Sequence, residues 1–280
     1  MSFYKKISEK LKNKIPEEKL ILLPRGYNLF NDVLIIKLKK ELYKYKKEIG
    51  KAILQTLPYV KTVILEKEIK GIKRTPKIEI IAGKKKTKTI FSEFNCYFSI
   101  DFSKAMWSGG NKFERQRIVK QIKKDEVIVD MFAGIGYWSI FIAKLSPAKI
   151  IYAIDLNKDA IKFLKKNIKL NKISNIQVLY GDCRKFSKKL ENKADRIIMG
   201  YLKDTEKFLP YALKIAKKEC IIHFHRLIHE KEINEVKEKI LRIIRENKCK
   251  GKILNILIVK SMAPKINHYV FDIKINKTNR

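Results

Sequence analysis

Residues 127–141, VIVDMFAGIGYWSIF, constrain the fold of this chain more than any other stretch. An apolar run ends at Asp130, a turn containing Gly134 and Gly136 follows, and an apolar segment with helical spacing continues until just before Pro147. This pattern predicts a buried strand, a tight turn and a helix. Glycines let a backbone approach a ligand closely, and a helix start offers unpaired N–H groups. The turn is therefore a candidate ligand site, although the same pattern also fits a purely structural turn.

Two later strands favour the ligand site. Residues 150–154 form a second apolar run that ends in Asp155, 19 residues after the second glycine of the turn, and residues 176–180 form a third, followed shortly by Asp182. An acid after the second strand of such a sheet commonly accepts hydrogen bonds from ribose hydroxyls. An acid after the third strand can accept one from an adenine amino group. Together with Asp130, these acids predict an adenosine pocket at one edge of a parallel sheet.

The charge balance indicates an anionic partner. The chain has 64 Lys and Arg against 29 Asp and Glu, a formal net charge of +35. A lysine-rich genome explains part of this number, but charged surfaces of that origin normally balance lysine with glutamate. The excess therefore favours the phosphate backbone of a nucleic acid. Membrane binding is the alternative, yet no apolar stretch approaches the ~20 residues of a spanning helix, and no long amphipathic helix with a Trp/Phe face is evident.

Cysteine usage favours a reducing compartment. The four cysteines are far apart in the sequence and form no Cys-x-x-Cys motif. We therefore expect no disulfide and no metal site. The first residues, MSFYKK, do not resemble a secretory signal. These features predict a cytoplasmic protein.

The order of the expected elements predicts four segments. Residues 1–19 form a basic N-terminal arm, residues 20–96 a small α+β domain, residues 97–121 a connector with a substrate loop, and residues 122–280 a larger α/β domain. The last segment contains seven expected strands, of which the final two form a hairpin. This order is typical of a Rossmann-like, class I S-adenosylmethionine (SAM)-dependent methyltransferase fold with a seven-stranded mixed sheet.

Five short motifs resemble those of a known family. They are DMFAGIG at 130–136, AIDLN at 153–157, NIKLN at 167–171, GD at 181–182 and DRIIM at 195–199. As a set they resemble the archaeal and eukaryotic enzymes that act at guanosine 37 of tRNA, and the resemblance covers about residues 20–275. One branch of that family methylates N1 of guanosine 37. The other transfers the 3-amino-3-carboxypropyl group of SAM to C7 of 4-demethylwyosine in tRNA(Phe), in wybutosine-derivative biosynthesis.

Two departures from the family pattern separate the branches. The methyltransferases carry an Asn-Leu-Pro or Asn-Pro-Pro turn after the fourth strand, where this chain has Met199-Gly200-Tyr201. They also carry a Ser-Pro-Arg-Leu-type loop with a functional arginine before the glycine turn, where this chain has SGGN at 108–111. The resemblance therefore implies an aminocarboxypropyltransferase that releases 5′-methylthioadenosine, with SAM as donor and the anticodon region of tRNA(Phe) as partner. A monomer is the expected state.

The resemblance also implies roles for individual residues. Asp155 binds the ribose, Asp182 with Cys183 binds the adenine, and Ser108 and Arg115 hold the methionine moiety, whose carboxylate suits an arginine. The structural alternative for Arg115 is an ion pair on the surface of a helix. The expected SAM-binding residues are Ser108, Arg115, Asp130, Gly134, Gly136, Asp155, Asp182 and Cys183, and the expected substrate-binding residues are Trp107 and Tyr201.

Several assignments stay open at this stage. Trp107, beside two glycines, is either a substrate platform or a core residue. Tyr201, His223 and His225 are all conceivable proton acceptors, and no catalytic residue is assigned. The alternative functions are N1-methylation of guanosine 37 and, from another class, a non-catalytic tRNA-binding module.

Overall fold

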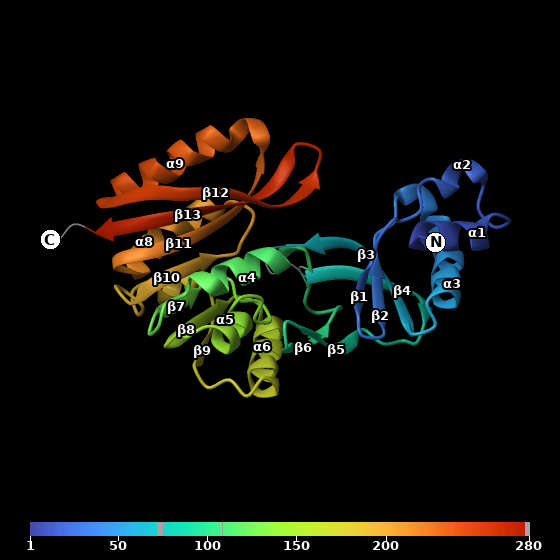
Figure 1. Ribbon diagram of the computed structural model, residues 1–280, viewed down its shortest axis with the longest axis horizontal. Helices are drawn as coiled ribbons and strands as arrows, with labels where there is room; N and C mark the ends of the chain where they lie inside the picture. The colour runs from blue at the N-terminus through green and yellow to red at the C-terminus, as the bar shows by residue number, and fades with distance from the viewer. Residues whose placement is uncertain (72–74, 108, 278–280) are drawn as a thin grey trace. The chain divides into compact units, whose positions relative to one another are not determined.

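The computed structural model describes residues 1–71, 75–107 and 109–277, and the chain divides into two compact units, Met1–Trp107 and Ser108–Arg280. Each unit has its own hydrophobic core. Figure 1 gives the order of the helices and strands along the chain. The segment boundaries expected at residues 19, 96 and 121 stay a prediction.

The first unit is built on a four-stranded sheet with helices against one face. The sheet has the order β1-β2-β3-β4, in which only β2 and β3 are parallel. Helix α1 packs on α3, and α3 packs on β3 and β4. The buried side chains Ile7 and Leu11 place α1 within this core. The elements are α1 (Phe3–Leu11), α2 (Glu17–Leu20), β1 (Asn28–Phe30), β2 (Val33–Ile36), η1 (Lys40–Tyr45), α3 (Lys46–Thr56), β3 (Thr62–Lys70) and β4 (Thr75–Gly83).

A β-hairpin, β5 (Lys88–Glu93) and β6 (Cys96–Asp101), completes this unit. Its turn uses Phe94 and Asn95, which both have positive φ. Phe91 and Phe98 face each other across the hairpin with their ring centroids 5.7 Å apart. The hairpin therefore contributes a small aromatic cluster to the first unit.

The second unit contains a seven-stranded mixed sheet of order β12-β13-β11-β10-β7-β8-β9. Strands β7 to β11 run parallel, whereas β13 is antiparallel to both β11 and β12. This arrangement confirms the expected Rossmann-like fold and the terminal hairpin. The strands are β7 (Val127–Asp130), β8 (Ile150–Asp155), β9 (Ile176–Tyr180), β10 (Ala194–Met199), β11 (Ala216–His229), β12 (Cys249–Ala263) and β13 (Ile266–Lys277).

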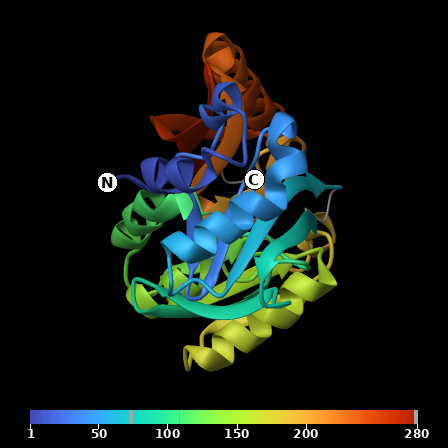
Figure 2. The same ribbon diagram turned by 90° about the vertical axis from the view of Figure 1, so that its right-hand side faces the viewer.

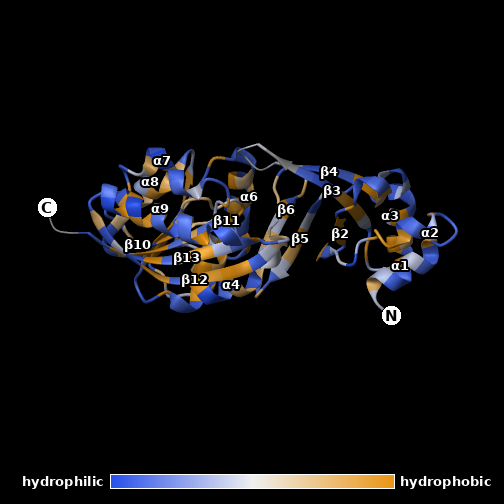
Figure 3. Ribbon diagram, turned by 90° about the horizontal axis from the view of Figure 1, so that it is seen from above, coloured by the Kyte–Doolittle hydropathy of each residue, from blue (hydrophilic) through white to orange (hydrophobic). Residues whose placement is uncertain are grey.

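Helices cover both faces of this sheet, as Figures 1 and 2 show. Side chains of α4 and α5 share a core with β7, β8 and β10 on one face, whereas α8 and α9 pack with β10, β11 and β13 on the other. In Figure 3 the strands of this sheet are largely hydrophobic, and hydrophilic residues gather on the outer sides of the helices. The helical segments are η2 (Gly109–Asn111), α4 (Lys112–Gln121), α5 (Ser139–Leu145), α6 (Lys158–Leu170), α7 (Cys183–Phe186), η3 (Thr205–Phe208), α8 (Leu209–Ile215), η4 (Glu230–Glu232) and α9 (Ile233–Glu246).

A buried chain of charged and polar side chains ties α4 to three strands. Arg117 donates hydrogen bonds to Glu114 at 2.7 Å and to Asp272 of β13 at 2.6 and 2.9 Å. Asp272 in turn bonds Nδ1 of His223 on β11 at 2.6 Å, and Nε2 of His223 lies 2.8 Å from the guanidinium of Arg196 on β10. Because an arginine can only donate, Nε2 accepts and the Nδ1–H donates to Asp272. His223 is therefore neutral, with both ring nitrogens engaged.

The electrostatics of this cluster favour an ionised Asp272. Burial raises the pKa of this carboxyl, but the hydrogen bonds from His223 and Arg117 outweigh burial and hold its pKa well below the usual range. Such a carboxylate stabilises the fold above its ordinary pKa, and the stabilisation is lost as the pH falls toward its folded-state pKa.

We predict that Asp272→Asn destabilises the protein by about 2–4 kcal/mol at neutral pH, because it removes the buried carboxylate that pairs with the half-buried Arg117. Urea unfolding measures the loss, which should shrink below about pH 4, where the unfolded carboxyl takes up a proton. The control is Glu246→Gln, which removes one partner of the exposed Arg242–Glu246 pair at 3.9 Å and should cost less than ~1 kcal/mol. Equal losses for the two variants would contradict the prediction.

Candidate functional site

The glycine turn after β7 has room for backbone only. Gly134 has a φ of +57° and Gly136 a φ of +104°, in the region that favours glycine. A Cβ on Gly134 would lie 2.0 Å from Cε2 of Tyr137, and one on Gly136 would lie 2.4 Å from Cγ1 of Ile140. A side chain at Gly134 would displace the ring of Tyr137, and one at Gly136 would press on Ile140 of α5. The two expected glycines therefore shape the start of this helix.

Asp155 holds the turn from the neighbouring strand. It ends β8, which pairs with β7. Its Oδ2 accepts a hydrogen bond from the backbone N–H of Gly134 at 2.7 Å, and its Oδ1 accepts one from Asn157 at 2.7 Å. Burial raises the pKa of Asp155, and these two hydrogen bonds oppose that effect. Each carboxylate oxygen keeps a further lone pair, so the group can still accept hydrogen bonds from ribose hydroxyls.

Asp130 supports the turn from within the hydrophobic core. It is fully buried at the end of β7, and its Oδ2 accepts a hydrogen bond from the hydroxyl of Ser139 at 2.7 Å. Burial raises its pKa to about 7, against the hydrogen bonds from Ser139 and the N–H of Phe132. A group with no exposed surface fixes the geometry of the turn, so any contribution of Asp130 to ligand binding is indirect.

Asn167 is a support of the turn to which the sequence assigned no role. Its side-chain amide donates a 3.0 Å hydrogen bond to the carbonyl of Ile135, between the two glycines. The residue lies on α6 and is fully buried. Its place in the NIKLN motif was the signal in the sequence that marked it.

The third expected acid, Asp182, follows β9, the strand beside β8. It caps α7 by accepting a 2.9 Å hydrogen bond from the N–H of Arg184, and it forms a 2.5 Å ion pair with the guanidinium of the same residue. The hydrogen bond from Arg184 lowers the pKa of Asp182. Cys183 is buried, and burial raises the pKa of its thiol to about 12. Its thiol is therefore neutral and suited to packing rather than to nucleophilic attack.

Tyr201 belongs to an aromatic group at the same edge of the sheet. Its ring stacks on Phe132 with centroids 5.1 Å apart, and Phe208 meets both rings edge-on. The guanidinium of Arg184 lies 5.5 Å from the centre of the Phe208 ring. Arg184 therefore contacts both the acid after β9 and the aromatic group. The sequence did not single out Phe132 and Phe208, although Phe132 stands inside the glycine-turn motif.

The loop after β10 is fixed on both sides of Tyr201. The hydroxyl of Thr205 donates to the carbonyl of His225 at 2.8 Å and contacts the carbonyl of Tyr201. A Cβ on Gly200 would lie 2.8 Å from Nε1 of Trp138, a buried residue at the start of α5. Position 200 therefore has no room for a side chain while Trp138 keeps its place.

The two histidines considered as proton acceptors lie in the sheet. His223 uses both ring nitrogens in the charged cluster described above. His225 is fully buried, its Nδ1 lies 3.0 Å from Nε2 of His268, and its ring centroid is 5.2 Å from that of Trp138. Neither histidine is exposed to a ligand in this structure.

Two further expected residues, Arg115 and Trp107, belong to different units. Arg115 on α4 is buried, and its guanidinium lies 5.1 Å from the centre of the Phe141 ring. The structural alternative placed Arg115 on the surface of the helix, and this position is wrong because the side chain is buried. Trp107 belongs to the first unit, where it packs against Phe91 and Phe98. Ser108 lies outside the described residues.

The described ranges contain no group of three or more His, Cys, Asp and Glu side chains arranged to hold a metal ion. No helix within them is long and apolar enough to cross a membrane. All four cysteines are buried and free.

Two family models match the chain: the TRM5/TYW2 methyltransferase domain at residues 89–253 and the TYW2 N-terminal domain at residues 7–87. A tRNA(Phe) (4-demethylwyosine(37)-C(7)) aminocarboxypropyltransferase of Pyrococcus horikoshii is 40% identical over 98% of this chain and 97% of its own. A tRNA 4-demethylwyosine(37)-methyltransferase, Taw21, of Saccharolobus solfataricus is 37% identical over 82% of this chain and 85% of its own.

Two solved structures are also similar to this chain over most of its length. The crystal structure of P. horikoshii TYW2 in complex with MeSAdo has a TM-score of 0.81 and 37% identity, covering 99% of this chain and all of its own. That of Trm5b from Pyrococcus abyssi has a TM-score of 0.85 and 33% identity, covering 94% of this chain and 78% of its own. The resemblance inferred from the five motifs is confirmed.

We predict that Asp130 makes stability fall as the pH rises. A carboxyl whose pKa moves from 3.8 to about 7 on folding stabilises the native state fully below its unfolded pKa and loses that contribution as the pH passes through the folded value. Asp130→Asn should therefore flatten the fall in melting temperature between about pH 5 and pH 8. Calorimetry at several pH values measures the slope. Asp159→Asn, at an exposed position of α6, should leave the slope unchanged; equal slopes for wild type and Asp130→Asn would refute the prediction.

Proposed function

The chain belongs to the family of the TRM5/TYW2 methyltransferase domain, and on that premise we propose that it transfers the 3-amino-3-carboxypropyl group of SAM to C7 of 4-demethylwyosine at position 37 of tRNA(Phe). The observation that carries the proposal is the loop after β10, where Gly200 and Tyr201 replace the Asn-Leu-Pro or Asn-Pro-Pro turn of the N1-methyltransferases. The likeness to the P. horikoshii enzyme over nearly the whole of both chains supports it.

The packing around Gly200 argues against N1-methylation. An asparagine at this position would bring its Cβ within 2.8 Å of the Trp138 indole nitrogen. Real Cβ atoms do not approach other atoms so closely, so the indole or the loop would have to move. Without that asparagine, the loop has no side-chain amide to orient the attacked ring nitrogen. The loop therefore fits a reaction at another atom of the base, such as C7, better than methylation of N1.

The residues at the sheet edge fit an adenosine-containing donor. The turn at Gly134 and Gly136 admits close approach of the donor, Asp155 offers free lone pairs to the ribose, and Asp182 stands beside it for the adenine. Arg115 is the arginine proposed for the carboxylate of the methionine moiety. Because its side chain is only 1% exposed, a direct contact with that carboxylate requires the side chains that cover it to move when the donor binds.

The proposed reaction is a displacement at carbon. C7 of the base forms a bond to Cγ of the methionine arm, the bond from Cγ to the sulfonium sulfur breaks with its electron pair moving to sulfur, and the C7 proton leaves to solvent or a base. The products are the alkylated base and 5′-methylthioadenosine. What the protein must supply is orientation, since holding two reactants in line replaces a bimolecular encounter. The stacked rings of Phe132 and Tyr201 provide a planar surface suited to a tricyclic base.

The charge of the chain supports tRNA as the partner. A net charge of +35 is unusual for an enzyme that binds only small molecules. Such an excess of lysine and arginine is suited to neutralising the phosphates of a nucleic-acid backbone. A tRNA substrate also agrees with the relatives described above, which are tRNA-modifying enzymes. We assign the anticodon region as the part of the tRNA that enters the site.

Mass spectrometry of both products tests the proposed reaction. After incubation of the protein with SAM and tRNA(Phe) bearing 4-demethylwyosine, we expect 5′-methylthioadenosine and a base heavier by one aminocarboxypropyl group. S-adenosylhomocysteine with a base heavier by one methyl group would show methyl transfer, as the name of Taw21 describes for that relative, and would overturn the proposal. An unmodified transcript serves as the control for N1-methylation.

The role of Asp155 is tested by SAM binding. We expect Asp155→Ala to weaken SAM binding roughly 10- to 100-fold, the size of one or two lost hydrogen bonds to a charged group. Titration calorimetry measures the affinity, and the melting temperature shows whether the turn is still folded. Asp159→Ala removes the same charge from the exposed surface of α6 and should bind SAM as the wild type does. Unchanged affinity in folded Asp155→Ala would refute the assignment.

A further inference from the structure

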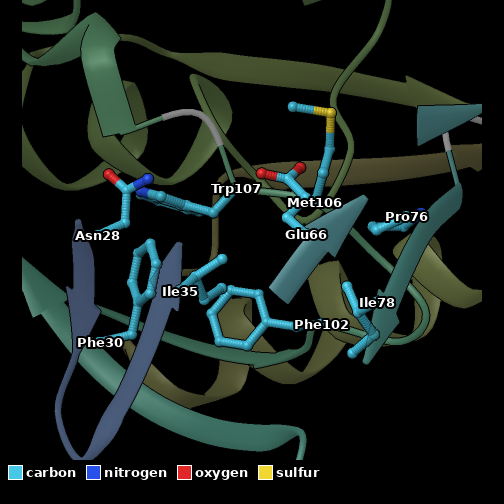
Figure 4. Close-up of a pocket in the computed structure, with 9 residues that line it drawn as sticks. All are labelled: Asn28, Phe30, Ile35, Glu66, Pro76, Ile78, Phe102, Met106 and Trp107. Atoms are coloured by element: carbon cyan, nitrogen blue, oxygen red, sulfur yellow. The ribbon is translucent and has the colours of Figure 1, made fainter. Parts of the chain in front are cut away.

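A small cleft in the first unit, lined by residues of β1 to β4 and of the segment after β6, is filled by its own side chains. Figure 4 shows Phe30, Ile35 and Phe102 gathered in it. The rings of Phe30 and Phe102 are buried and in contact, with their centroids 4.8 Å apart, so they leave no room for a flat ligand between them. The second unit instead contains a polar contact that the fold leaves unmade, in the loop before α4.

Asn111 is a buried residue whose side-chain oxygen has no partner among the described residues. The residue is 9% exposed, and its Oδ1 is buried and accepts no hydrogen bond there. Although Asn111 directly precedes α4, its side chain does not cap the helix. A buried acceptor without a donor costs free energy. Its presence is explained if a ligand supplies the donor.

Asn111 lies on the buried face of α4 together with Arg115. The buried residues Asn111, Glu114, Arg115 and Ile118 recur at helical spacing. The carboxylate of Glu114 is engaged, because it accepts hydrogen bonds from Arg117 at 2.7 Å. Side chains four positions apart on a helix lie one above the other. This face therefore places an amide oxygen one helical turn from a guanidinium.

Contacts along α4 show that its first turn lies at the edge of the sheet that carries the glycine turn. The carbonyl of Gln121, the last residue of α4, accepts a 3.0 Å hydrogen bond from Arg196 near the start of β10. Arg117, one turn earlier, binds the residue of β13 that is level, through β11, with Ile198 near the end of β10. Going back along α4 thus means moving toward the ends of the parallel strands. Asn111 therefore lies at the edge where the donor is expected (Figure 1).

The loop before α4 is held on one side by a flexible side chain. A Cβ on Gly110 would lie 2.7 Å from Cδ of Lys260. Lys260 lies on the part of β12 that extends, through its pairing with β13 and β11, past the end of β10. The neighbouring atom belongs to a lysine side chain and not to backbone, so the loop can open when that side chain shifts.

An amino-acid group needs a hydrogen-bond donor and an acceptor side by side, because its carboxylate accepts hydrogen bonds and its ammonium donates them from the same carbon. We propose that Asn111 binds the methionine arm of SAM, with Oδ1 accepting a hydrogen bond from the α-ammonium while Arg115 takes the carboxylate. The inference rests on the proposed function, because it takes SAM as the donor and this arm as the group transferred.

This assignment separates the group that is transferred from the product that leaves. The 3-amino-3-carboxypropyl group carries both charges that α4 holds, whereas 5′-methylthioadenosine has neither. After the transfer, the contacts of Asn111 and Arg115 no longer hold the nucleoside, which is then bound through its adenosine alone. Asn111 therefore both fixes the arm for attack at Cγ and makes the affinity for the donor higher than that for the nucleoside product.

Binding of three adenosine ligands tests the contact. SAM carries the ammonium and the carboxylate, decarboxylated SAM carries the ammonium alone, and 5′-methylthioadenosine carries neither. In titration calorimetry we expect Asn111→Ala to weaken the binding of SAM and of decarboxylated SAM about tenfold, the size of one hydrogen bond to a charged group. Its affinity for 5′-methylthioadenosine should equal that of the wild type. Gln116→Ala removes an exposed amide from the same helix and should bind all three ligands as the wild type does.

The melting temperature separates donor binding from a structural role. Because Oδ1 of Asn111 accepts no hydrogen bond from the described residues, Asn111→Ala without ligand should melt at the wild-type temperature or higher. A lower melting temperature with equal losses for all three ligands would show a structural role and overturn the proposal, as would unchanged affinity for SAM. A loss for SAM but not for decarboxylated SAM would place Asn111 on the carboxylate and overturn the assignment to the ammonium.

Failure of this inference can be told apart from failure of the proposed function. If the wild type releases 5′-methylthioadenosine while Asn111→Ala binds SAM unchanged, the contact is refuted and the proposed reaction stands. If the wild type releases S-adenosylhomocysteine, the proposed reaction is refuted, and the three-ligand comparison still decides whether Asn111 binds the ammonium.

Discussion

The second unit depends on one cation, Arg117, which holds two buried carboxylates that could not otherwise share one site. Glu114 and Asp272 would repel each other in a medium of low polarity, and each would be costly to bury alone. Through Arg117 they join α4 to the last strand, and Asp272 continues the link to His223 on β11. The same short helix carries Arg115, whose guanidinium lies over the ring of Phe141, so the cluster anchors the helix from which Arg115 projects.

At the edge of the sheet, three aspartates have different roles because their side chains differ in exposure. Asp130, Asp155 and Asp182 each follow a parallel strand, yet Asp130 is sealed inside, Asp155 fixes the glycine turn while keeping lone pairs for a ligand, and Asp182 is engaged by Arg184. The backbone of the glycine turn is thus held in place by hydrogen bonds to two neighbouring side chains, Asp130 and Asp155. Its aromatic part, Phe132 with Tyr201, adds the flat surface that a polycyclic base needs.

The sequence predicted what depends on local pattern and missed what depends on distant partners. The strand–turn–helix at 127–141, the three acids at one edge and the seven strands could all be predicted, because hydrophobic periodicity and turn residues define them within a few residues. The Arg117–Asp272 pair joins residues 155 positions apart, and nothing local marks it. Residues 41–57 have apolar residues at the spacing of a single helix, but the structure has a 3-10 segment, Lys40–Tyr45, followed by α3, Lys46–Thr56. The contact between Gly200 and Trp138 likewise exists only in three dimensions.

That contact makes the two positions dependent on each other during divergence. A replacement at 200 that adds a side chain is tolerated only once the indole at 138 has become smaller or moved, and a smaller residue at 138 leaves a void until 200 is filled. A lineage changing from one chemistry to the other must therefore pass through an overpacked or an underpacked intermediate. The contact thus makes the effect of a replacement at either position depend on the residue at the other, which is epistasis that arises from packing alone.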